Sequence, residues 1–480
     1  MRTIVWFRGK DLRVKDHAPL RDAVANGDVI PLFVLDPYFF APERARELPH
    51  RIQFLLDSLH ELSQSIARLG SRLIVVAGKS IDVVPRLAKA WRADRVVAHR
   101  WTEPFGRERD RRIDEALGGA LVLYEGETLL PPGTLRTGGG TPYAVFTPFS
   151  RAAKAAASIA QPLAAPRRLP GIPHDVRARK VAIPTTAELG IPRNDAILVG
   201  GETAAGQRLR RFVRGVARTY DKTRDRMDLA GTSRLSADLK FGTVSVRAVW
   251  ASVATVGGRG SSTFHNELLW REFAYHTLWD RPDVLERPFR DDFIGFPWRT
   301  GHSEWAAWVA GTTGYPIVDA SARQLLGEGF VHNRARMISA SFLTKHLLIE
   351  YRRGEAHYMK FLSDGDWANN NLGWQWSAGC GCDAQPYFRI FNPVTQGERF
   401  DPSGDYVRRW VPELARLPAR LIHQPWTAPD DVLRAAGVEL GKTYPRPIVD
   451  HQLARERFLA MAASHLRGRA PRGQRLPASS

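Results

Sequence analysis

Apolar and polar positions follow two different patterns along the chain, and the change falls near residue 200. In the first part, short β-branched apolar runs alternate with longer stretches of helical spacing. The runs that predict strands are Thr3–Phe7, Val29–Leu35, Leu73–Ala77, Val96–His99 and Leu121–Tyr124. The stretches that predict helices are Arg51–Leu69, Ile81–Trp91 and Arg107–Leu117. Such alternation is typical of a doubly wound parallel sheet, so we expect an α/β domain over residues 1–128.

The rest of the chain predicts a linker and then a helical domain. Residues 129–202 are rich in Pro, Gly, Ala and Arg and have poor periodicity, which indicates an interdomain linker. Residues 203–466 predict an all-α domain, and residues 467–480 a basic flexible tail. The helices expected in that domain are Gly206–Thr219, Val246–Val256, Ser262–Trp279, Ala320–Gly327, Val331–Arg352, Ala356–Asp364 and His451–Arg467.

Composition narrows the class of protein. A chain of 480 residues exceeds the size of most single cores, which favours two domains. The net charge of +19 favours a polyanionic partner, most simply nucleic acid, although compositional bias and solubility explain it almost as well. Two cysteines, Cys380 and Cys382, are too few for a disulfide framework or a structural zinc site, so we expect no metal and a cytoplasmic protein. No segment has the pattern of a signal peptide or a membrane span.

Three segments of the helical domain combine residue types that core packing does not require. The stretch 364–400 holds two carboxylates, a run of Asn, two Trp two residues apart and a Gly-rich turn. In FHNELLWREF, Glu267, Trp270 and Arg271 share one helix face, as Asn333 and Met337 do in HNRARM. Each has a simpler interpretation: a capped aromatic helix, a surface ion pair, or a methionine that fills the core.

A fourth segment, GTSRLS at 231–236, brings hydroxyls and backbone amides to the expected start of a helix. It suits either an ordinary helix cap or a diphosphate site. No Gly-rich dinucleotide fingerprint follows the first strand, which disfavours a nicotinamide enzyme.

Taken together, these four segments resemble the photolyase/cryptochrome family. The opening WFRGKDLRVKDH also resembles the amino-terminal signature of photolyases, with one extra residue between Arg8 and Asp11. HNRARM, Trp376 and Asn370 are most similar to cyclobutane pyrimidine dimer photolyases of the class I type. The resemblance implies light-dependent repair of these dimers by electron transfer from excited, reduced FAD to a flipped-out lesion. A blue-light photoreceptor without repair activity and a nonenzymatic DNA-binding flavoprotein are the alternatives.

The resemblance also assigns roles to single residues. It implies that Glu267, Trp270, Asn333, Met337 and Trp376 contact the lesion. It implies that FAD is bound by Tyr220, Thr232, Ser233, Arg234, Leu235, Ser236, Phe264, Arg271, Arg336, Asp364, Asp366 and Asn370. DNA phosphates are assigned to Arg224, Arg334, Arg389 and Arg399. We expect a monomer with DNA as its partner and no membrane association.

Two further expectations concern light capture and photoreduction. The resemblance implies an electron relay of Trp374, Tyr351 and Trp298, in which Tyr351 replaces a tryptophan. Because oxidised tyrosine sheds its phenolic proton, we expect slower or rerouted photoreduction with repair intact. Lys240 resembles a lysine of deazaflavin-binding relatives, and Phe105 and Gly106 replace an Asn-Glu pair associated with folate binding. A second, antenna chromophore is therefore expected, with a deazaflavin or another flavin favoured over folate.

Overall fold

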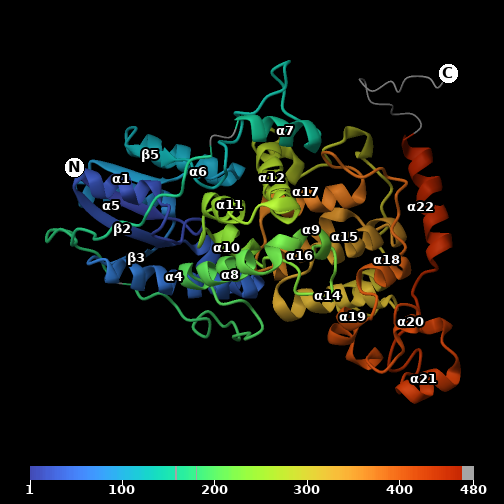
Figure 1. Ribbon diagram of the computed structural model, residues 1–480. Helices are drawn as coiled ribbons and strands as arrows, with labels where there is room; N and C mark the ends of the chain where they lie inside the picture. The colour runs from blue at the N-terminus through green and yellow to red at the C-terminus, as the bar shows by residue number, and fades with distance from the viewer. Residues whose placement is uncertain (157–158, 180, 467–480) are drawn as a thin grey trace.

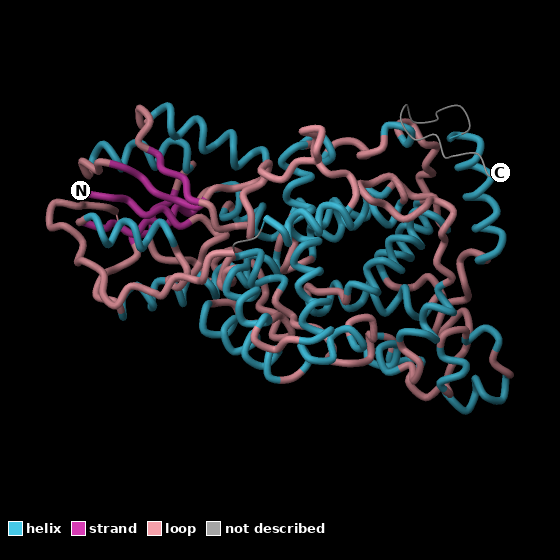
Figure 2. Tube along the Cα trace, turned by 45° about the horizontal axis from the view of Figure 1, so that its top comes forward, coloured by secondary structure: helices cyan, strands magenta, loops and turns pink. Residues whose placement is uncertain are grey.

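The computed structural model describes residues 1–156, 159–179 and 181–466, so the expected tail at 467–480 lies outside the described residues, as does Arg467. A sheet with its helices forms one end of the molecule, and a larger helical body forms the other (Figures 1 and 2). None of the described helices is both long and apolar enough to cross a membrane.

The sheet is parallel throughout, with the strand order β3-β2-β1-β4-β5. Its strands are β1 Arg2–Phe7, β2 Asp28–Leu35, β3 Ile74–Ala77, β4 Arg95–His99 and β5 Leu121–Tyr124. Alternate residues of β1 enter two separate cores: Val5 packs with α1 and α4 on one face, whereas Ile4 packs with α5 and α6 on the other. Helices on both faces confirm the expected doubly wound sheet. The helices of this part are α1 Ala18–Asn26, α2 Pro37–Phe40, α3 Pro42–Glu47, α4 Pro49–Arg68, α5 Ser80–Ala90 and α6 Pro104–Ala116.

The helical body is built around α12 (Gly258–Asp280), which packs against α7 (Phe146–Ala156), α9 (Tyr220–Thr223), α11 (Val246–Ala254) and α17 (Trp367–Ala378). Its first helices are α8 Glu202–Arg214, α9 Tyr220–Thr223, α10 Ser236–Phe241, α11 Val246–Ala254, α12 Gly258–Asp280, α13 His302–Ala310, α14 Pro316–Glu328 and α15 Asn333–Ser341. Its later helices are α16 Tyr351–Phe361, α17 Trp367–Ala378, α18 Pro393–Phe400, α19 Asp405–Trp410, α20 Ala419–Ile422, α21 Asp430–Ala436 and α22 His451–Leu466.

The expected single helix over Val331–Arg352 is wrong. Helix α15 continues through one wide turn, Phe342–His346, and then stops; α16 begins only at Tyr351. Leu348 has a φ of 57° and Ile349 pairs with Arg299, yet both apolar side chains are fully buried. Hydrophobic periodicity cannot separate such a buried non-helical segment from a buried helix.

The linker holds structure that its sequence does not predict. Helix α7, Phe146–Ala156, lies within it and packs against α12. Farther along, Leu169 and Val176 are buried in the two cores of the sheet domain, and Leu169 donates a backbone hydrogen bond to Leu69. The linker therefore packs on both parts of the molecule.

Candidate active site

A cavity of about 370 Å³ opens in the helical body between α12, α15 and α17. It collects ten of the predicted site residues, including all five assigned to the lesion. These ten are Arg224, Glu267, Trp270, Arg271, Asn333, Arg336, Met337, Asn370, Trp374 and Trp376. Residues more than a hundred positions apart in the sequence thus line one cavity.

Helix α12 supplies a carboxyl group and an indole to this cavity. Glu267 is half-buried and forms an ion pair with Arg224. Burial raises the pKa of Glu267, and Arg224 opposes the shift only in part. Trp270 presents its ring to the cavity.

The sequence did not point to the support behind Trp270. The ring of Phe146, from α7, lies 3.8 Å from it at an interplanar angle of 7°. Phe146 and Trp270 lie 124 positions apart, and no local sequence pattern predicts a contact over that distance. The stack is therefore visible only in the folded structure.

Helix α15 contributes an adjacent polar and apolar pair and a partly buried ion pair. The Asn333 amide lies 3.8 Å from the Met337 sulfur. The Arg336 guanidinium donates to both carboxylate oxygens of Asp364, at 3.0 and 2.8 Å. Both of these contacts come from Nη2, and Nε donates to the Val331 carbonyl at 2.8 Å, so the two partners fix the side chain beside the cavity. Arg334 instead turns to Asp225 at 2.8 Å.

Helix α17 forms the third wall, and Asp366 fixes its start. The Asp366 carboxylate accepts hydrogen bonds from the Asn369 backbone at 2.9 Å and from the Tyr275 hydroxyl at 2.6 Å. Burial alone would raise the pKa of Asp366, but Lys10 and Lys240 hold it below its ordinary value. The amide of Asn370 donates to the Glu355 carbonyl at 3.1 Å, which orients its side chain.

The segment GTSRLS lies outside the lining of this cavity. Arg234 has a φ of 55° and pairs with Glu328 at 3.0 Å, and its Nε is buried without a partner among the described residues. Ser236 begins α10, with Leu235 at the cap position. Thr232 and Ser233 remain partly exposed, and the Ser233 hydroxyl accepts a hydrogen bond from the Leu235 backbone at 3.4 Å.

The other predicted residues are more dispersed. Tyr220 and Phe264 meet in one aromatic cluster, with ring centroids 5.1 Å apart, beside the cavity rather than in it. Arg389 and Arg399 are exposed. Tyr351 is buried, its hydroxyl has no hydrogen-bond partner among the described residues, and burial raises its pKa.

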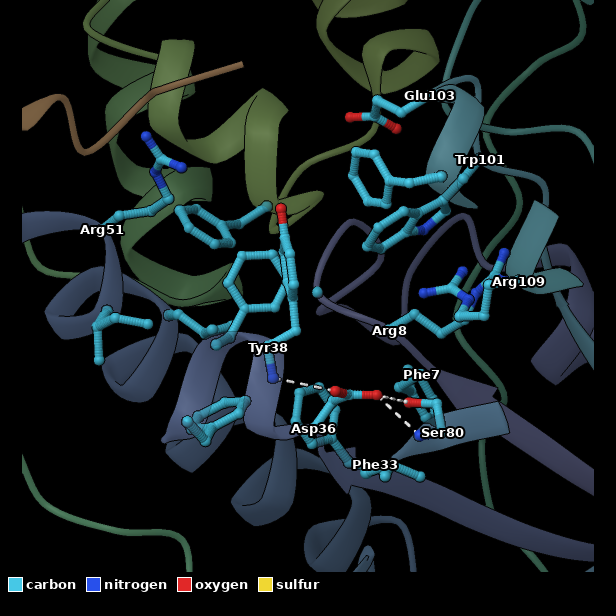
Figure 3. Close-up of a pocket in the computed structure, with 18 of the residues that line it drawn as sticks. Phe7, Arg8, Phe33, Asp36, Tyr38, Arg51, Ser80, Trp101, Glu103 and Arg109 are labelled. Atoms are coloured by element: carbon cyan, nitrogen blue, oxygen red, sulfur yellow. Dashed lines mark hydrogen bonds between the residues drawn. The ribbon is translucent and has the colours of Figure 1, made fainter. Parts of the chain in front are cut away.

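A second cavity, of about 250 Å³, lies at the carboxyl ends of the strands, where Figure 3 shows its side chains. Arg8 follows β1, Asp36 follows β2 and Trp101 follows β4, which is where ligands bind in open α/β sheets. Lys240 and Phe241 close the cavity from the helical body.

Its walls combine aromatic rings with cations. Tyr38, Phe105 and Trp101 offer ring surfaces, while Arg8 and Arg51 offer guanidinium groups. Nitrogens on both arginines and the indole nitrogen of Trp101 are buried without a hydrogen-bond acceptor among the described residues. These donors suit a planar, polar ligand.

A compact buried cluster of Asp11, His17 and His99 has the spacing of metal ligands. However, the Nδ1 of His17 accepts a hydrogen bond from the Leu20 backbone at 3.1 Å, so the neutral ring carries its proton on Nε2, which lies 3.6 Å from Asp11. The Nδ1 of His99 lies within hydrogen-bonding distance of the Asp11 carboxylate, at 3.4 Å, whereas the Nε2 of His17 has no hydrogen-bond partner among the described residues.

A doubly wound parallel sheet and a helical body, with a cavity lined by both polar and aromatic side chains, form the arrangement of a known family. Residues 264–464 match the model of the FAD binding domain of DNA photolyase, and residues 3–167 match that of DNA photolyase. The chain belongs to the DNA photolyase family, and FAD is its cofactor.

Individual relatives agree with this assignment. The chain is 42% identical to a deoxyribodipyrimidine photo-lyase of Agrobacterium fabrum, over 96% of this chain and 97% of that one. It is 37% identical to the enzyme of that name from Escherichia coli, over 97% and 99%.

Two solved structures are also similar. A class III photolyase from Agrobacterium tumefaciens has a TM-score of 0.90 and 40% identity, over 97% of this chain and 98% of that one. A Synechocystis cryptochrome has a TM-score of 0.88 and 32% identity, over 96% and 99%.

Proposed function

We propose that the chain is a deoxyribodipyrimidine photo-lyase that splits cyclobutane pyrimidine dimers in DNA under light. The observation that carries this proposal is one cavity whose walls hold both the lesion residues and Arg336 and Asn370, assigned to the flavin. A dimer and the flavin ring would therefore meet without intervening protein.

The cavity residues act by binding, orienting and donating protons. Trp270 and Trp376 provide apolar walls for a flipped-out dimer, whose weak pairing lowers the cost of extrusion. Asn333 and Met337 contact the bases. A protonated Glu267 donates a hydrogen bond to a thymine carbonyl and stabilises negative charge there, which its raised pKa favours. Bound FAD, when fully reduced and excited by light, supplies the electron that splits the dimer and takes it back.

The remaining assigned residues hold the cofactor and the DNA. The Arg336–Asp364 pair and Asp366 position the flavin end, and residues 231–236 bind the diphosphate through backbone amides and hydroxyls. DNA phosphates around the mouth of the cavity are bound by four arginines, Arg224, Arg334, Arg389 and Arg399. For Arg224 this requires that the substrate shares or displaces its ion pair with Glu267.

The second cavity is the proposed site of an antenna chromophore. Its aromatic walls, unpartnered arginine nitrogens and Lys240 suit a deazaflavin or another flavin better than a folate. An archaeal photolyase from Sulfolobus tokodaii, 28% identical with a TM-score of 0.82, is described with two FAD molecules and a novel light-harvesting cofactor. Extraction of the purified protein and mass spectrometry of its chromophores would identify the ligand.

The test of repair uses chemically reduced protein and an oligonucleotide with one thymine dimer, in the dark and under blue light. We expect repair only in the light. The variant Glu267→Leu, which removes the donor, should retain FAD but lose repair yield per absorbed photon, and the parent's yield should fall as pH rises through the raised pKa of Glu267. Glu267→Gln keeps a neutral donor, so its yield should lose that pH dependence. FAD binding without repair in either condition would favour the photoreceptor, and an unchanged yield in Glu267→Leu would remove the role of this carboxyl group.

A further inference from the structure

Three tryptophans form a continuous series from the active-site cavity to the protein surface. Trp374 lines the cavity, and the ring centroid of Trp308 lies 6.1 Å from its own at an interplanar angle of 72°. Trp305 follows at 5.4 Å and 25° from Trp308. Trp308 is buried and Trp305 is partly exposed, and both lie on α13. The series therefore ends where solutes can reach it.

The relay expected from the family resemblance has a difficulty at its middle member. Tyr351 must lose its phenolic proton when oxidised, and its buried hydroxyl has no hydrogen-bond partner among the described residues. The pairing of Arg299 with Ile349 does bring the segment of Trp298 beside that of Tyr351. Yet the aromatic rings that the structure places in contact with Trp374 are those of Tyr358 and Trp308.

We propose that Trp308 and Trp305 carry electrons to Trp374 during photoreduction of the oxidised flavin. The proposal rests on the proposed function, since it needs FAD in the cavity. Trp374 gives one electron to the light-excited, oxidised cofactor, Trp308 replaces that electron, and Trp305 replaces the one lost by Trp308 while its own indole proton passes to water. The neutral Trp305 radical then takes a hydrogen atom from a thiol in solution, and the thiol becomes a thiyl radical.

The surroundings of the two indoles favour proton loss at Trp305 alone. The Trp308 indole nitrogen donates a hydrogen bond to the buried Ser339 carbonyl at 3.3 Å. Because a carbonyl oxygen is a poor proton acceptor, the indole keeps its proton there. The Arg353 guanidinium lies 4.4 Å from the Trp305 ring centre, so its charge disfavours a positive indole and favours the neutral radical. His357 lies 5.8 Å from Trp305, and burial lowers its pKa to about 4, so it adds no charge at neutral pH.

The experiment measures photoreduction of the holoprotein with oxidised FAD, in the presence of a thiol, under blue light. Flavin absorbance gives the rate, and transient absorption detects the neutral tryptophan radical. Trp305→Phe and Trp308→Phe should each slow photoreduction severalfold, and Trp305→Phe should abolish the long-lived radical. Tyr351→Phe should retain the parent rate. Trp410→Phe, which changes a partly exposed tryptophan of α19, is the matched control and should also retain it.

FAD content and thermal melting show whether each variant is folded. A parent-like rate and radical in Trp305→Phe would overturn the proposal, as would a loss of photoreduction in Tyr351→Phe with none in Trp308→Phe. A parent that holds FAD but is not photoreduced overturns the relay alone. Repair by chemically reduced protein tests the proposed function separately, because it requires no photoreduction.

Discussion

The stack of Phe146 on Trp270 gives a prediction that separates lesion recognition from general DNA binding. The two rings are nearly parallel at 3.8 Å, and Phe146 is reached only through the linker helix α7. With Phe146 behind it, Trp270 has one face held and the other available to a dimer. Phe146→Leu removes the support while it keeps an apolar side chain.

The expected magnitude follows from the energy of such pairs. An aromatic pair contributes about 0.5–1.5 kcal/mol beyond the area that it buries, and 1 kcal/mol corresponds to about a fivefold change in Kd. Because the stack exists in both the free and the DNA-bound protein, its loss reaches the binding constant only through the cost of ordering Trp270, so the pair energy sets an upper limit of about fivefold on the weakening of binding to dimer-containing DNA. The affinity for undamaged DNA should not change, because undamaged DNA is bound through its phosphates and Trp270 makes no phosphate contact.

The assay is fluorescence anisotropy with matched oligonucleotides, with and without one thymine dimer. Phe149→Leu is the control. Phe149 is buried on the same helix, and its ring lies 5.1 Å from that of Phe273, so it packs in the core and does not stack on Trp270. Phe146→Tyr should restore the ratio of the two affinities. Equal weakening for damaged and undamaged DNA, or an unchanged affinity for the dimer, would refute the reasoning.

Three further predictions address phosphate binding, photoreduction and stability. Arg399→Gln should lower the salt dependence of DNA binding by about one unit, equally for damaged and undamaged DNA; an unchanged slope would exclude a phosphate contact. Tyr351→Trp should accelerate flavin photoreduction, since it places an indole at the position that the family resemblance assigns to the relay between Trp374 and Trp298, and equal rates would contradict this. Burial raises the pKa of Glu355 from 4.5 to about 7, so the folded state keeps a proton that the unfolded chain loses, and stability falls as pH rises between these values. Glu355→Gln should therefore raise the melting temperature at pH 8 but hardly at pH 4.5, and an equal effect at both would show that its charge is not the cause.

The strands were predictable to within about one residue because each is a short β-branched run between helical stretches. The helices of the second domain were predictable in type, but the break at 347–350 was not. There the buried residues Leu347, Leu348 and Ile349 have the composition of a helix core, and only their tertiary contacts hold them outside a helix. Helix α7 was missed for a related reason, as its stability comes from packing on α12.

The cavity was predictable only when several segments were considered together. Taken singly, Glu267, Asn333 and Trp376 each have an ordinary structural explanation. Together with their neighbours at helical spacing, they lie on three helices that line one cavity. Contacts between distant segments carry no comparable pattern. The support of Trp270 by Phe146 and the approach of Trp308 to Trp374 therefore required the structure.

The extra residue in the opening motif has a structural role that its position in a loop conceals. Gly9 adopts a φ of 85°, and the following Lys10 is buried in contact with Glu103 and Glu127. The charge of Lys10 also helps to hold the pKa of Asp366 low, at the start of the helix that carries Asn370 and Trp376. A buried cation costs stability unless it is paired, so this lysine makes the sheet domain and the helical body depend on one shared set of charges. That set lies between the two cavities, because Glu103 lines one and Asp366 begins a wall of the other, so the same charges contact both.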